Sequence, residues 1–349
     1  MKPYATGLAV GKFCPLHRGH QHLLDQALEQ CEALIVISYT KPEFPGSEPE
    51  HRERWLASLY PDTTRLVIDD ARLAEHCRVR GLPIATLPHN DAPDDTHRHF
   101  VAWLLRHILE ASVDVVFTSE AYGEGFANVL SQVQRDADGP CAAHVMVDRD
   151  RVAVPISGTA VRKDPHGRRN YLDPLVYRDF VERVAILGGE STGKSTLAGL
   201  LASRLSTAHA AEYGRELWEF KQGALSEEDM LLIARTQIAR EEALALEAHR
   251  YVICDTTPLT TMLYAQAMFG RTSPELEKLA RRPYGLVLLL APDAPFIQDG
   301  TRRDEAFRLW QHEWYLGQLD ARRIAYRVLA GTWDERLNGA IDAVLALNR

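Results

Sequence analysis

The chain has 349 residues, of which 46% are hydrophobic and 25% are charged. This length predicts two domains, and the composition is that of an ordinary globular protein, which excludes a disordered, collagen-like or low-complexity chain. The net charge of −8 argues against a general nucleic-acid-binding surface, although it leaves a local basic patch open.

The five cysteines are scattered and form no CxxC pair, which argues against a disulfide framework or a cysteine-rich zinc module. The N-terminus has no signal-peptide pattern. The longest apolar run, residues 286–291, is far shorter than the roughly 20 residues of a membrane span. We therefore expect a reduced, cytoplasmic setting without membrane insertion.

The first half of the chain alternates short apolar runs with amphipathic stretches. The apolar runs predict buried parallel strands at residues 6–10, 33–39, 65–68, 113–117 and 143–147. The amphipathic stretches predict helices at residues 18–31, 50–59, 96–110 and 125–134. Strand–helix–strand alternation indicates a parallel sheet wound by right-handed crossovers.

The second half begins after a polar loop at residues 163–171 and a short predicted helix at 173–180. Its predicted strands are residues 183–187, 208–211, 251–254, 285–290 and 325–329. The sequence therefore predicts an α/β fold with two doubly wound parallel-sheet domains. We place them at residues 1–180 and 181–349.

The first predicted strand leads into GKFCPLHRGH, residues 11–20. His17 and His20 are three residues apart at the start of a helix, so their imidazoles can face the same way and bind phosphate oxygens. Gly19 permits close approach of the backbone. A metal site at Cys14, His17 and His20 is an alternative, but no fourth ligand lies nearby in the sequence.

A second phosphate-binding element is predicted at ISGTAVR, residues 156–162. Ser157 is a plausible N-cap, with Thr159 and Arg162 in the first turns of the helix that follows. Hydroxyls, free N–H groups and a guanidinium together suit a polyphosphate. A simple capped helix is the alternative interpretation.

The second half opens with GGESTGKS, residues 188–195, which fits the P-loop pattern between a strand and a helix. In this motif the backbone N–H groups cradle phosphate, Lys194 reaches the β and γ phosphates, and the Ser195 hydroxyl ligates Mg²⁺. A glycine-rich turn that matches by chance is the alternative. The motif predicts nucleotide binding and leaves the reaction open.

Three later features point toward a kinase. Asp255 ends a strand near the P-loop, and Glu212 and Arg215 follow another strand at the same sheet edge, where open α/β sheets bind ligands. The loop DGTRRD, residues 299–304, can close over ATP and stabilise the transferred phosphoryl group. Helix caps and surface ion pairs are the alternatives.

At these residues a family resemblance enters. GKFCPLHRGH together with ISGTAVR resembles the nucleotidylyltransferase superfamily. With a C-terminal P-loop kinase added, nearly the whole chain resembles the NadR family of bifunctional nicotinamide-nucleotide adenylyltransferases and ribosylnicotinamide kinases. Further matching stretches are FTSEAYG at 117–123, EYGRE at 212–216 and DGTR at 299–302.

The resemblance implies two consecutive steps of NAD salvage. A C-terminal P-loop kinase would phosphorylate nicotinamide riboside, and a Rossmann-like N-terminal domain would join the resulting mononucleotide to the AMP part of ATP, giving NAD and pyrophosphate. ATP would be the co-substrate and Mg²⁺ the cofactor. The residues alone indicate two ATP sites and phosphorus chemistry, not nicotinamide.

The resemblance also assigns site residues. At the first ATP site we expect Gly11, Lys12, Phe13, His17, His20, Ser157, Thr159 and Arg162, and at the mononucleotide we expect Arg52, Trp55, Ser119, Glu120 and Tyr122. At the kinase ATP site we expect Gly188, Glu190, Ser191, Thr192, Gly193, Lys194, Ser195, Thr196, Arg302 and Arg303. At the riboside we expect Glu212, Tyr213, Arg215 and Asp255, and at Mg²⁺ we expect Ser195 and Asp255. The catalytic candidates are His17, His20, Arg162, Lys194, Asp255 and Glu212.

Several alternatives stay open at this point. Trp55 is equally well explained as a core residue, and either Asp255 or Glu212 can act as the kinase base. The chain can act on another substrate pair, or serve as a nucleotide-sensing regulator. Some family members carry an N-terminal helix-turn-helix region, but here the first strand starts about five residues after Met1, so we expect no DNA binding. The oligomeric state is open, a homo-oligomer included.

Overall fold

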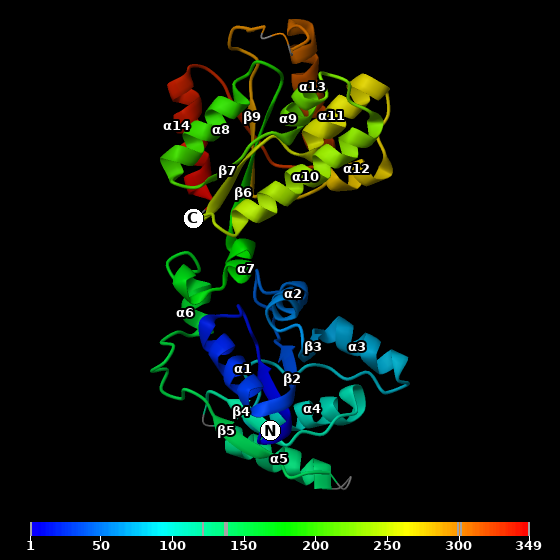
Figure 1. Ribbon diagram of the computed structural model, residues 1–349, viewed down its shortest axis with the longest axis vertical. Helices are drawn as coiled ribbons and strands as arrows, with labels where there is room; N and C mark the ends of the chain where they lie inside the picture. Colours follow the sequence, from blue (N-terminus) through cyan, green and yellow to red (C-terminus); the bar gives the residue numbers. More distant parts are fainter. Residues whose placement is uncertain (1, 121, 136–138, 299, 301, 348–349) are drawn as a thin grey trace. The chain divides into compact units, whose positions relative to one another are not determined.

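The computed structural model describes residues 2–120, 122–135, 139–298, 300 and 302–347. Asp299 and Thr301 of the predicted arginine-bearing loop, and Ala121 of FTSEAYG, lie outside the described residues. The chain divides into two compact units, Met1–Asp179 and Phe180–Arg349, each with its own five-stranded sheet (Figure 1). The predicted α/β class with two doubly wound parallel sheets is confirmed.

The sheet of the first unit has the order β3-β2-β1-β4-β5, and every neighbouring pair is parallel. Its strands are β1 (Tyr4–Gly11), β2 (Cys31–Tyr39), β3 (Thr64–Ile68), β4 (Val115–Thr118) and β5 (Ala143–Met146). Its α-helices are α1 (Arg18–Gln30), α2 (Pro49–Leu59), α3 (Asp70–Val79), α4 (Asp94–Leu104), α5 (Gly123–Arg135), α6 (Gly158–Lys163) and α7 (Pro174–Tyr177). The strand order reverses at β1, and ligands of open α/β sheets bind beyond the carboxyl ends of strands at such a point.

Most predicted elements of the first unit are found with their ends shifted by one or two residues, as β4 illustrates. β4 begins at Val115 rather than residue 113, because Gln134 of α5 takes the backbone groups of Val113. Gln134 Oε1 accepts from the Val113 N–H at 2.7 Å, and Gln134 Nε2 donates to the Val113 carbonyl at 3.0 Å. The predicted helix 96–110 is α4 followed by a π-helical stretch, Leu105–Leu109.

The sheet of the second unit has the order β10-β9-β6-β8-β7 and is also parallel throughout. Its strands are β6 (Glu182–Gly188), β7 (Ala208–Ala210), β8 (Tyr251–Asp255), β9 (Leu286–Leu290) and β10 (Arg327–Leu329). Its helices are α8 (Lys194–Leu205), α9 (Tyr213–Phe220), α10 (Glu227–Ala245), α11 (Pro258–Phe269), α12 (Pro274–Leu279), α13 (Glu305–Ala321) and α14 (Trp333–Ala346). In the described part of the chain, no helix is long and apolar enough to cross a bilayer.

Side chains of the central strand β6 alternate between two apolar layers. Val184 and Ile186 are buried against α8 and α14, whereas Ala185 and Leu187 are buried against α10, α11 and α13 (Figure 1). Successive side chains of a strand point to opposite faces, so a strand covered on both faces is apolar throughout. This packing fixes the carboxyl end of β6, where the glycine-rich turn begins.

Candidate active sites

The first unit contains a cavity of about 400 Å³ beyond the carboxyl ends of β1, β2 and β4. It brings together residues from both predicted motifs of this unit. Its walls include Gly11, Lys12, Phe13, His17, His20, Ser157, Thr159 and Arg162. The structure thus places every residue expected at the first ATP site around one cavity.

His17 and His20 fix each other at the first turn of α1. His17 is the N-cap residue, and its Nδ1 accepts a hydrogen bond from the His20 N–H at 3.3 Å, while His20 Nδ1 accepts from the His17 N–H at 3.4 Å. The imidazole rings stack with centroids 3.6 Å apart. A neutral imidazole whose Nδ1 accepts carries its proton on Nε2. This arrangement therefore puts the ring proton of each histidine on Nε2.

Burial keeps both imidazoles neutral. It lowers the pKa of His17 to about 4, and the positive charge of Arg151 adds to this effect. Burial also lowers the pKa of His20 well below its usual value, with His17 as the next cause. At neutral pH the two histidines donate hydrogen bonds without adding charge, so the positive charge around this cavity comes from Lys12 and the arginines.

Arg162 ties the second motif to the first. It donates from Nη1 to the Cys14 carbonyl at 2.5 Å and from Nη2 to Thr159 Oγ1 at 3.0 Å, and its guanidinium lies 4.0 Å from the centroid of the Phe44 ring. Ser157 is the N-cap of α6, and its Oγ accepts a backbone hydrogen bond at 3.2 Å. Sequence positions some 140 residues apart therefore line one cavity, since Arg162 contacts Cys14 across 148 residues.

The alternative metal site at Cys14, His17 and His20 finds no support in the geometry. Cys14 Sγ donates to the Lys12 carbonyl at 3.0 Å and to the Ser47 carbonyl at 3.8 Å. Burial raises the pKa of this thiol to about 12, so it stays protonated. Among the described residues, no group of three or more His, Cys, Asp or Glu side chains is placed to hold a metal ion.

Ser119, Glu120 and Tyr122 follow β4 and line the same cavity. Thr118 at the end of the strand holds this loop: its Oγ1 donates to the Glu120 carbonyl at 2.9 Å and lies 2.8 Å from His144 Nε2. Three of the five residues expected at the mononucleotide thus lie beside those expected at ATP.

Arg52 and Trp55, the other two, are buried in α2 and do not line the cavity. Arg52 donates from Nη1 to Ser38 Oγ at 3.0 Å and from Nη2 to the Glu43 carboxylate at 2.9 and 3.0 Å. Trp55 Nε1 donates to Asp179 Oδ2 at 2.6 Å. These contacts hold α2 in place, which agrees with the core interpretation of Trp55 and leaves Arg52 away from the cavity wall.

Further cavity residues that the sequence analysis did not identify include Tyr39, Asn90, His97 and Arg151. Tyr39 ends β2, and its hydroxyl lies 2.8 Å from His97 Nδ1. The position of Tyr39 at the carboxyl end of a strand was a usable signal. Asn90 comes from irregular chain between α3 and α4, where no motif marks it.

The second unit contains a cavity of about 380 Å³ beside the glycine-rich turn. The expected residues that line it are Gly188, Glu190, Ser191, Lys194, Glu212, Arg215, Arg302 and Arg303. The expected residues that do not line it are Thr192, Gly193, Ser195, Thr196, Tyr213 and Asp255. The structure therefore gathers residues from the turn, the end of β7 and the arginine-bearing loop.

The turn between β6 and α8 has a P-loop conformation. Gly193 has a φ of 86°, in the left-handed region that favours glycine, and a Cβ there would collide with the Trp333 ring. Lys194 begins α8, and its Nζ donates to the Gly189 carbonyl at 3.0 Å; Thr192 Oγ1 donates to the same carbonyl at 2.8 Å. The turn is thus closed by its own side chains, and Lys194 lies folded back on it.

Glu212 lines this cavity with Lys194, and Asp255 is close enough to influence Glu212 electrostatically. Burial raises the pKa of Glu212, Lys194 partly offsets this rise, and Asp255 adds to it. Glu212 Oε2 lies 3.7 Å from Arg215 Nε. Asp255 is 2% exposed, and its Oδ1 is buried with no hydrogen-bond partner among the described residues. Such an oxygen is costly to bury unpaired, and a cation or its bound water would satisfy it.

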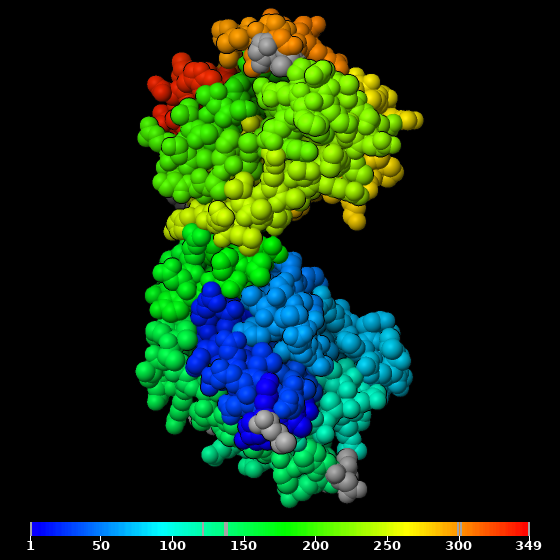
Figure 2. Space-filling model, viewed as in Figure 1, coloured from blue at the N-terminus to red at the C-terminus, as the bar shows by residue number. Residues whose placement is uncertain are grey.

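The arginine-bearing loop contacts the glycine-rich turn. The Ile297 N–H donates to Ser191 Oγ at 2.8 Å, Arg302 Nη1 donates to the same oxygen at 3.2 Å, and the Arg303 N–H donates to Glu190 Oε2 at 2.8 Å. Figure 2 shows the orange segment before α13 at the surface of its unit. These contacts attach the segment to the turn, and both arginines line the cavity.

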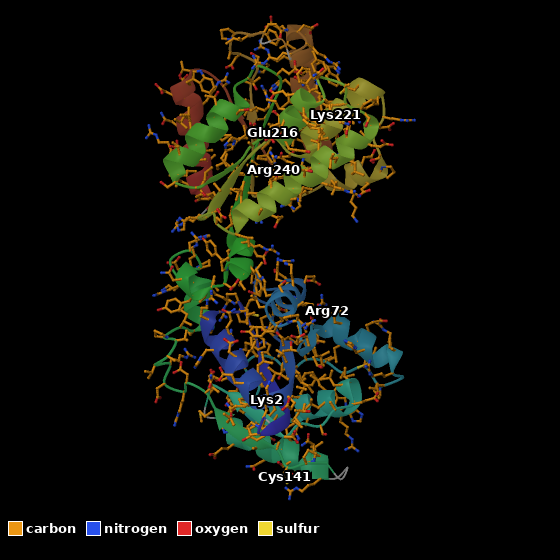
Figure 3. The ribbon with its side chains drawn as sticks, viewed as in Figure 1. Lys2, Arg72, Cys141, Glu216, Lys221 and Arg240 are labelled. Atoms are coloured by element: carbon orange, nitrogen blue, oxygen red, sulfur yellow. The ribbon has the colours of Figure 1, made fainter. Side chains whose placement is uncertain are left out.

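Tyr213 packs outside the cavity. The Arg240 guanidinium lies 4.6 Å from the centroid of its ring, and Arg240 pairs with Glu216 at 2.6 Å. Glu216 and Arg240 are both labelled in Figure 3. The aromatic residues that do line the cavity are Trp218 on α9, Tyr264 on α11 and Tyr315 on α13. Sequence reasoning missed these three because they come from three helices without a shared motif.

Comparisons with known proteins find relatives that match most of the chain. Two relatives are described as "Trifunctional NAD biosynthesis/regulator protein NadR". The protein from Escherichia coli (strain K12) is 28% identical over 313 residues, and that from Salmonella typhimurium (strain LT2) is 28% identical over 309 residues. Each alignment covers 85% of this chain and 71% of the relative. The chain is a homologue of the NadR proteins. The resemblance predicted from the motifs is thereby confirmed.

Solved NadR structures share the fold along the whole chain. The crystal structure of NadR in complex with NR has a TM-score of 0.71 at 23% identity and covers 98% of this chain and 96% of its own. The structure in complex with NAD and AMP-PNP has a TM-score of 0.71 at 22% identity and covers 99% and 97%. A family model described as an AAA domain, AAA_28, matches residues 183–336. The second unit is a nucleotide-binding P-loop domain.

Proposed function

We propose that the chain performs two consecutive phosphorus-transfer reactions of NAD biosynthesis. Residues 181–349 act as a ribosylnicotinamide kinase, which converts nicotinamide riboside and ATP to nicotinamide mononucleotide. Residues 1–180 act as a nicotinamide-nucleotide adenylyltransferase, which converts the mononucleotide and a second ATP to NAD and pyrophosphate. The observation that carries the proposal is a cavity in each unit with phosphate-binding groups between the central strand and the next helix. The NadR complexes with NR, NAD and AMP-PNP support the choice of substrates.

In the adenylyl transfer, a phosphate oxygen of the mononucleotide attacks the α-phosphorus of ATP. The bond from that phosphorus to the bridging oxygen breaks, and pyrophosphate leaves with the electron pair. The Nε2–H groups of His17 and His20, the hydroxyls of Ser157 and Thr159, and Arg162 stabilise the negative charge that develops on the phosphates. Ser119, Glu120 and Tyr122 contact the mononucleotide on the neighbouring wall. No covalent enzyme intermediate is needed.

In the kinase step, the 5′-hydroxyl of the riboside attacks the γ-phosphorus in line. Glu212 lines the cavity and accepts the hydroxyl proton, a task to which its raised pKa is suited. Lys194 exchanges the Gly189 carbonyl for the β and γ phosphates. Arg302 and Arg303 lie on the arginine-bearing loop and line the cavity, where their charge stabilises the transferred phosphoryl group.

The donor set of the second unit fits Mg²⁺. The unpaired buried Oδ1 of Asp255 and the hydroxyl of Ser195, in the first turn of α8, would hold the ion. Because Mg²⁺ in such sites keeps several waters and binds substrate phosphates, one or two protein oxygens suffice. When bound, it would neutralise charge on the β and γ phosphates.

A product assay tests the proposal. The purified chain is incubated with ATP, Mg²⁺ and nicotinamide riboside, and both nucleotide products are followed by chromatography over time. We expect the mononucleotide first and NAD after it. Mononucleotide without NAD would contradict the adenylyltransferase assignment. If no product forms, the mononucleotide is supplied directly: NAD formation then contradicts only the riboside as kinase substrate. If no product forms from either the riboside or the mononucleotide, the result would favour a nucleotide-sensing regulator.

A further inference from the structure

Residues 147–157 connect β5 to α6, and Asp148 gives this loop its shape. Its two carboxylate oxygens accept hydrogen bonds from the Ala153 and Val154 N–H groups, each at 3.0 Å, and its carbonyl accepts from the Arg151 N–H at 2.9 Å. Arg151 has a φ of 52°, which is uncommon for a residue with a long side chain. The loop therefore holds Arg151 in a defined place on the cavity wall.

The side chain of Arg151 has a loose partner. Its Nη2 lies 3.8 Å from Glu120 Oε1, and both side chains are about half exposed, at 45% and 58%. This distance exceeds that of a hydrogen bond, and exposed ion pairs contribute little to stability. Within the part of the chain that the structure describes, Glu120 is the sole ion-pair partner of Arg151. The guanidinium is thus available for a stronger anion.

Arg162, the arginine of the ISGTAVR motif, already makes hydrogen bonds within the protein. It donates one hydrogen bond from each Nη atom, to the Cys14 carbonyl and to Thr159 Oγ1, and the two histidines are neutral. A triphosphate brings about four negative charges into the same cavity, and its leaving group takes most of them. Among the described residues, the Arg151 guanidinium has only its 3.8 Å contact with Glu120, so its paired N–H groups can form new bidentate hydrogen bonds to phosphate oxygens.

We propose that Arg151 binds the β and γ phosphates of ATP during adenylyl transfer and the pyrophosphate that forms, and that Glu120 holds it in the ligand-free enzyme. This proposal rests on the adenylyltransferase activity proposed above. Arg151 acts electrostatically on both His17 and His20, which agrees with a position near the phosphate-binding imidazoles. Glu120 then has the role of a positioning residue in addition to its place beside the mononucleotide.

The reverse reaction provides the test. NAD and pyrophosphate give mononucleotide and ATP, and the kinase site does not use pyrophosphate, so the KM for pyrophosphate reports on the first cavity. For Arg151→Gln we expect this KM to rise about 10- to 100-fold, the size of lost charge-assisted hydrogen bonds. For Glu120→Gln we expect it to fall about two- to fivefold, because the competing carboxylate is removed.

Arg149→Gln is the matched control, since Arg149 is an exposed cation on the same loop that does not line the cavity. We expect its KM for pyrophosphate to match the wild type. An unchanged KM for NAD in Arg151→Gln shows that the variant is folded. An equal rise in the Arg151 and Glu120 variants would show that the pair only stabilises the loop, and this overturns the proposal.

Two other results also overturn it. If Arg151→Gln and Arg149→Gln raised the KM for pyrophosphate equally, the effect would come from the overall positive charge of the loop and not from a specific contact of Arg151. A raised KM for NAD with an unchanged KM for pyrophosphate would place Arg151 at the mononucleotide instead. If the wild-type chain catalyses neither direction, the adenylyltransferase proposal itself fails; if it is active and only these variants behave otherwise than expected, the inference on Arg151 alone fails.

Discussion

In the proposed function both cavities bind phosphate groups, but they are built from different chemical groups. In the first unit, the turn after the central strand β1 ends in His17 and His20, whose side chains cap α1 and stack on each other. In the second unit, the turn after β6 depends on a left-handed glycine, Gly193, and on Lys194. We therefore expect activity at the first site to depend on the chemistry and tautomer of the two histidine side chains. We expect activity at the second site to depend on the backbone conformation at Gly193 and on the charge of Lys194.

The largest expected effect separates the two sites through Lys194. Replacement of Lys194 by Ala removes the cation that reaches the transferred phosphoryl group, and we expect ribosylnicotinamide phosphorylation to fall about 10³-fold. NAD formation from supplied mononucleotide should stay at the wild-type rate. Initial rates of both reactions check this, and loss of both activities in a folded variant would contradict two independent sites.

His20 provides the converse test. For His20→Ala we expect adenylyl transfer to fall about 10²-fold, since one pre-placed donor to the phosphates is lost, and kinase activity to stay unchanged. His20→Gln keeps an N–H donor near the Nε2 position and should lose less than the alanine variant. Equal losses in the two variants would mean that His20 acts through the stacked pair or the helix cap rather than as a donor.

Gly193 tests the backbone half of the comparison. Gly193→Ala places a Cβ against the Trp333 ring at a φ of 86°, and we expect it to destabilise the second unit by about 2–3 kcal/mol and to raise the KM for ATP in the kinase reaction. Gly199→Ala is the matched control within α8, because nothing lies within 4 Å of a Cβ there; it should be neutral or stabilising. Denaturant unfolding of both variants measures the difference.

The smallest expected effect is the pH dependence of the first unit. The pKa of His17 falls from 6.5 to about 4 on folding, so between these pH values the unfolded chain binds a proton that the folded chain does not. His17 therefore lowers stability as the pH falls from 7.5 to 5, by about 1–2 kcal/mol. Burial raises the pKa of Glu43 to about 7, which acts in the opposite direction in the same unit.

The difference between wild type and His17→Gln isolates the histidine from Glu43. Hydrogen exchange of peptides from the first unit, measured at pH 7.5 and pH 5, should show that the variant loses less stability than the wild type over this interval. An equal loss in both proteins would contradict a neutral, buried His17.

The sequence correctly placed the GKFCPLHRGH and GGESTGKS motifs between a strand and a helix, because each motif consists of neighbouring residues and local geometry then puts it at the sheet edge. Arg52 and Trp55 show the limit of prediction from local sequence. The spacing of α2 reveals which residues share a face, but only the packed structure shows that this face meets Ser38, Glu43 and Asp179 rather than the cavity.

Cavity residues that come from several distant elements could not be predicted from the sequence either, because their meeting depends on tertiary packing. Trp218, Tyr264 and Tyr315 meet in the second cavity from three helices, and their sequence positions carry no common pattern. Gln134 likewise shortened the predicted strand at Val113 through a side-chain contact between α5 and the chain before β4. Such contacts depend on how helices pack on the sheet, which periodicity alone does not determine.

The most direct test of two independent sites is a complementation assay. His20→Ala and Lys194→Ala are assayed separately and as a mixture, with nicotinamide riboside, ATP and Mg²⁺. We predict that His20→Ala accumulates the mononucleotide, that Lys194→Ala alone forms no NAD from the riboside, and that the mixture forms NAD. A mixture that forms no NAD although the mononucleotide accumulates in it, or a Lys194 variant that forms NAD from the riboside unaided, would contradict the assignment of one reaction to each unit.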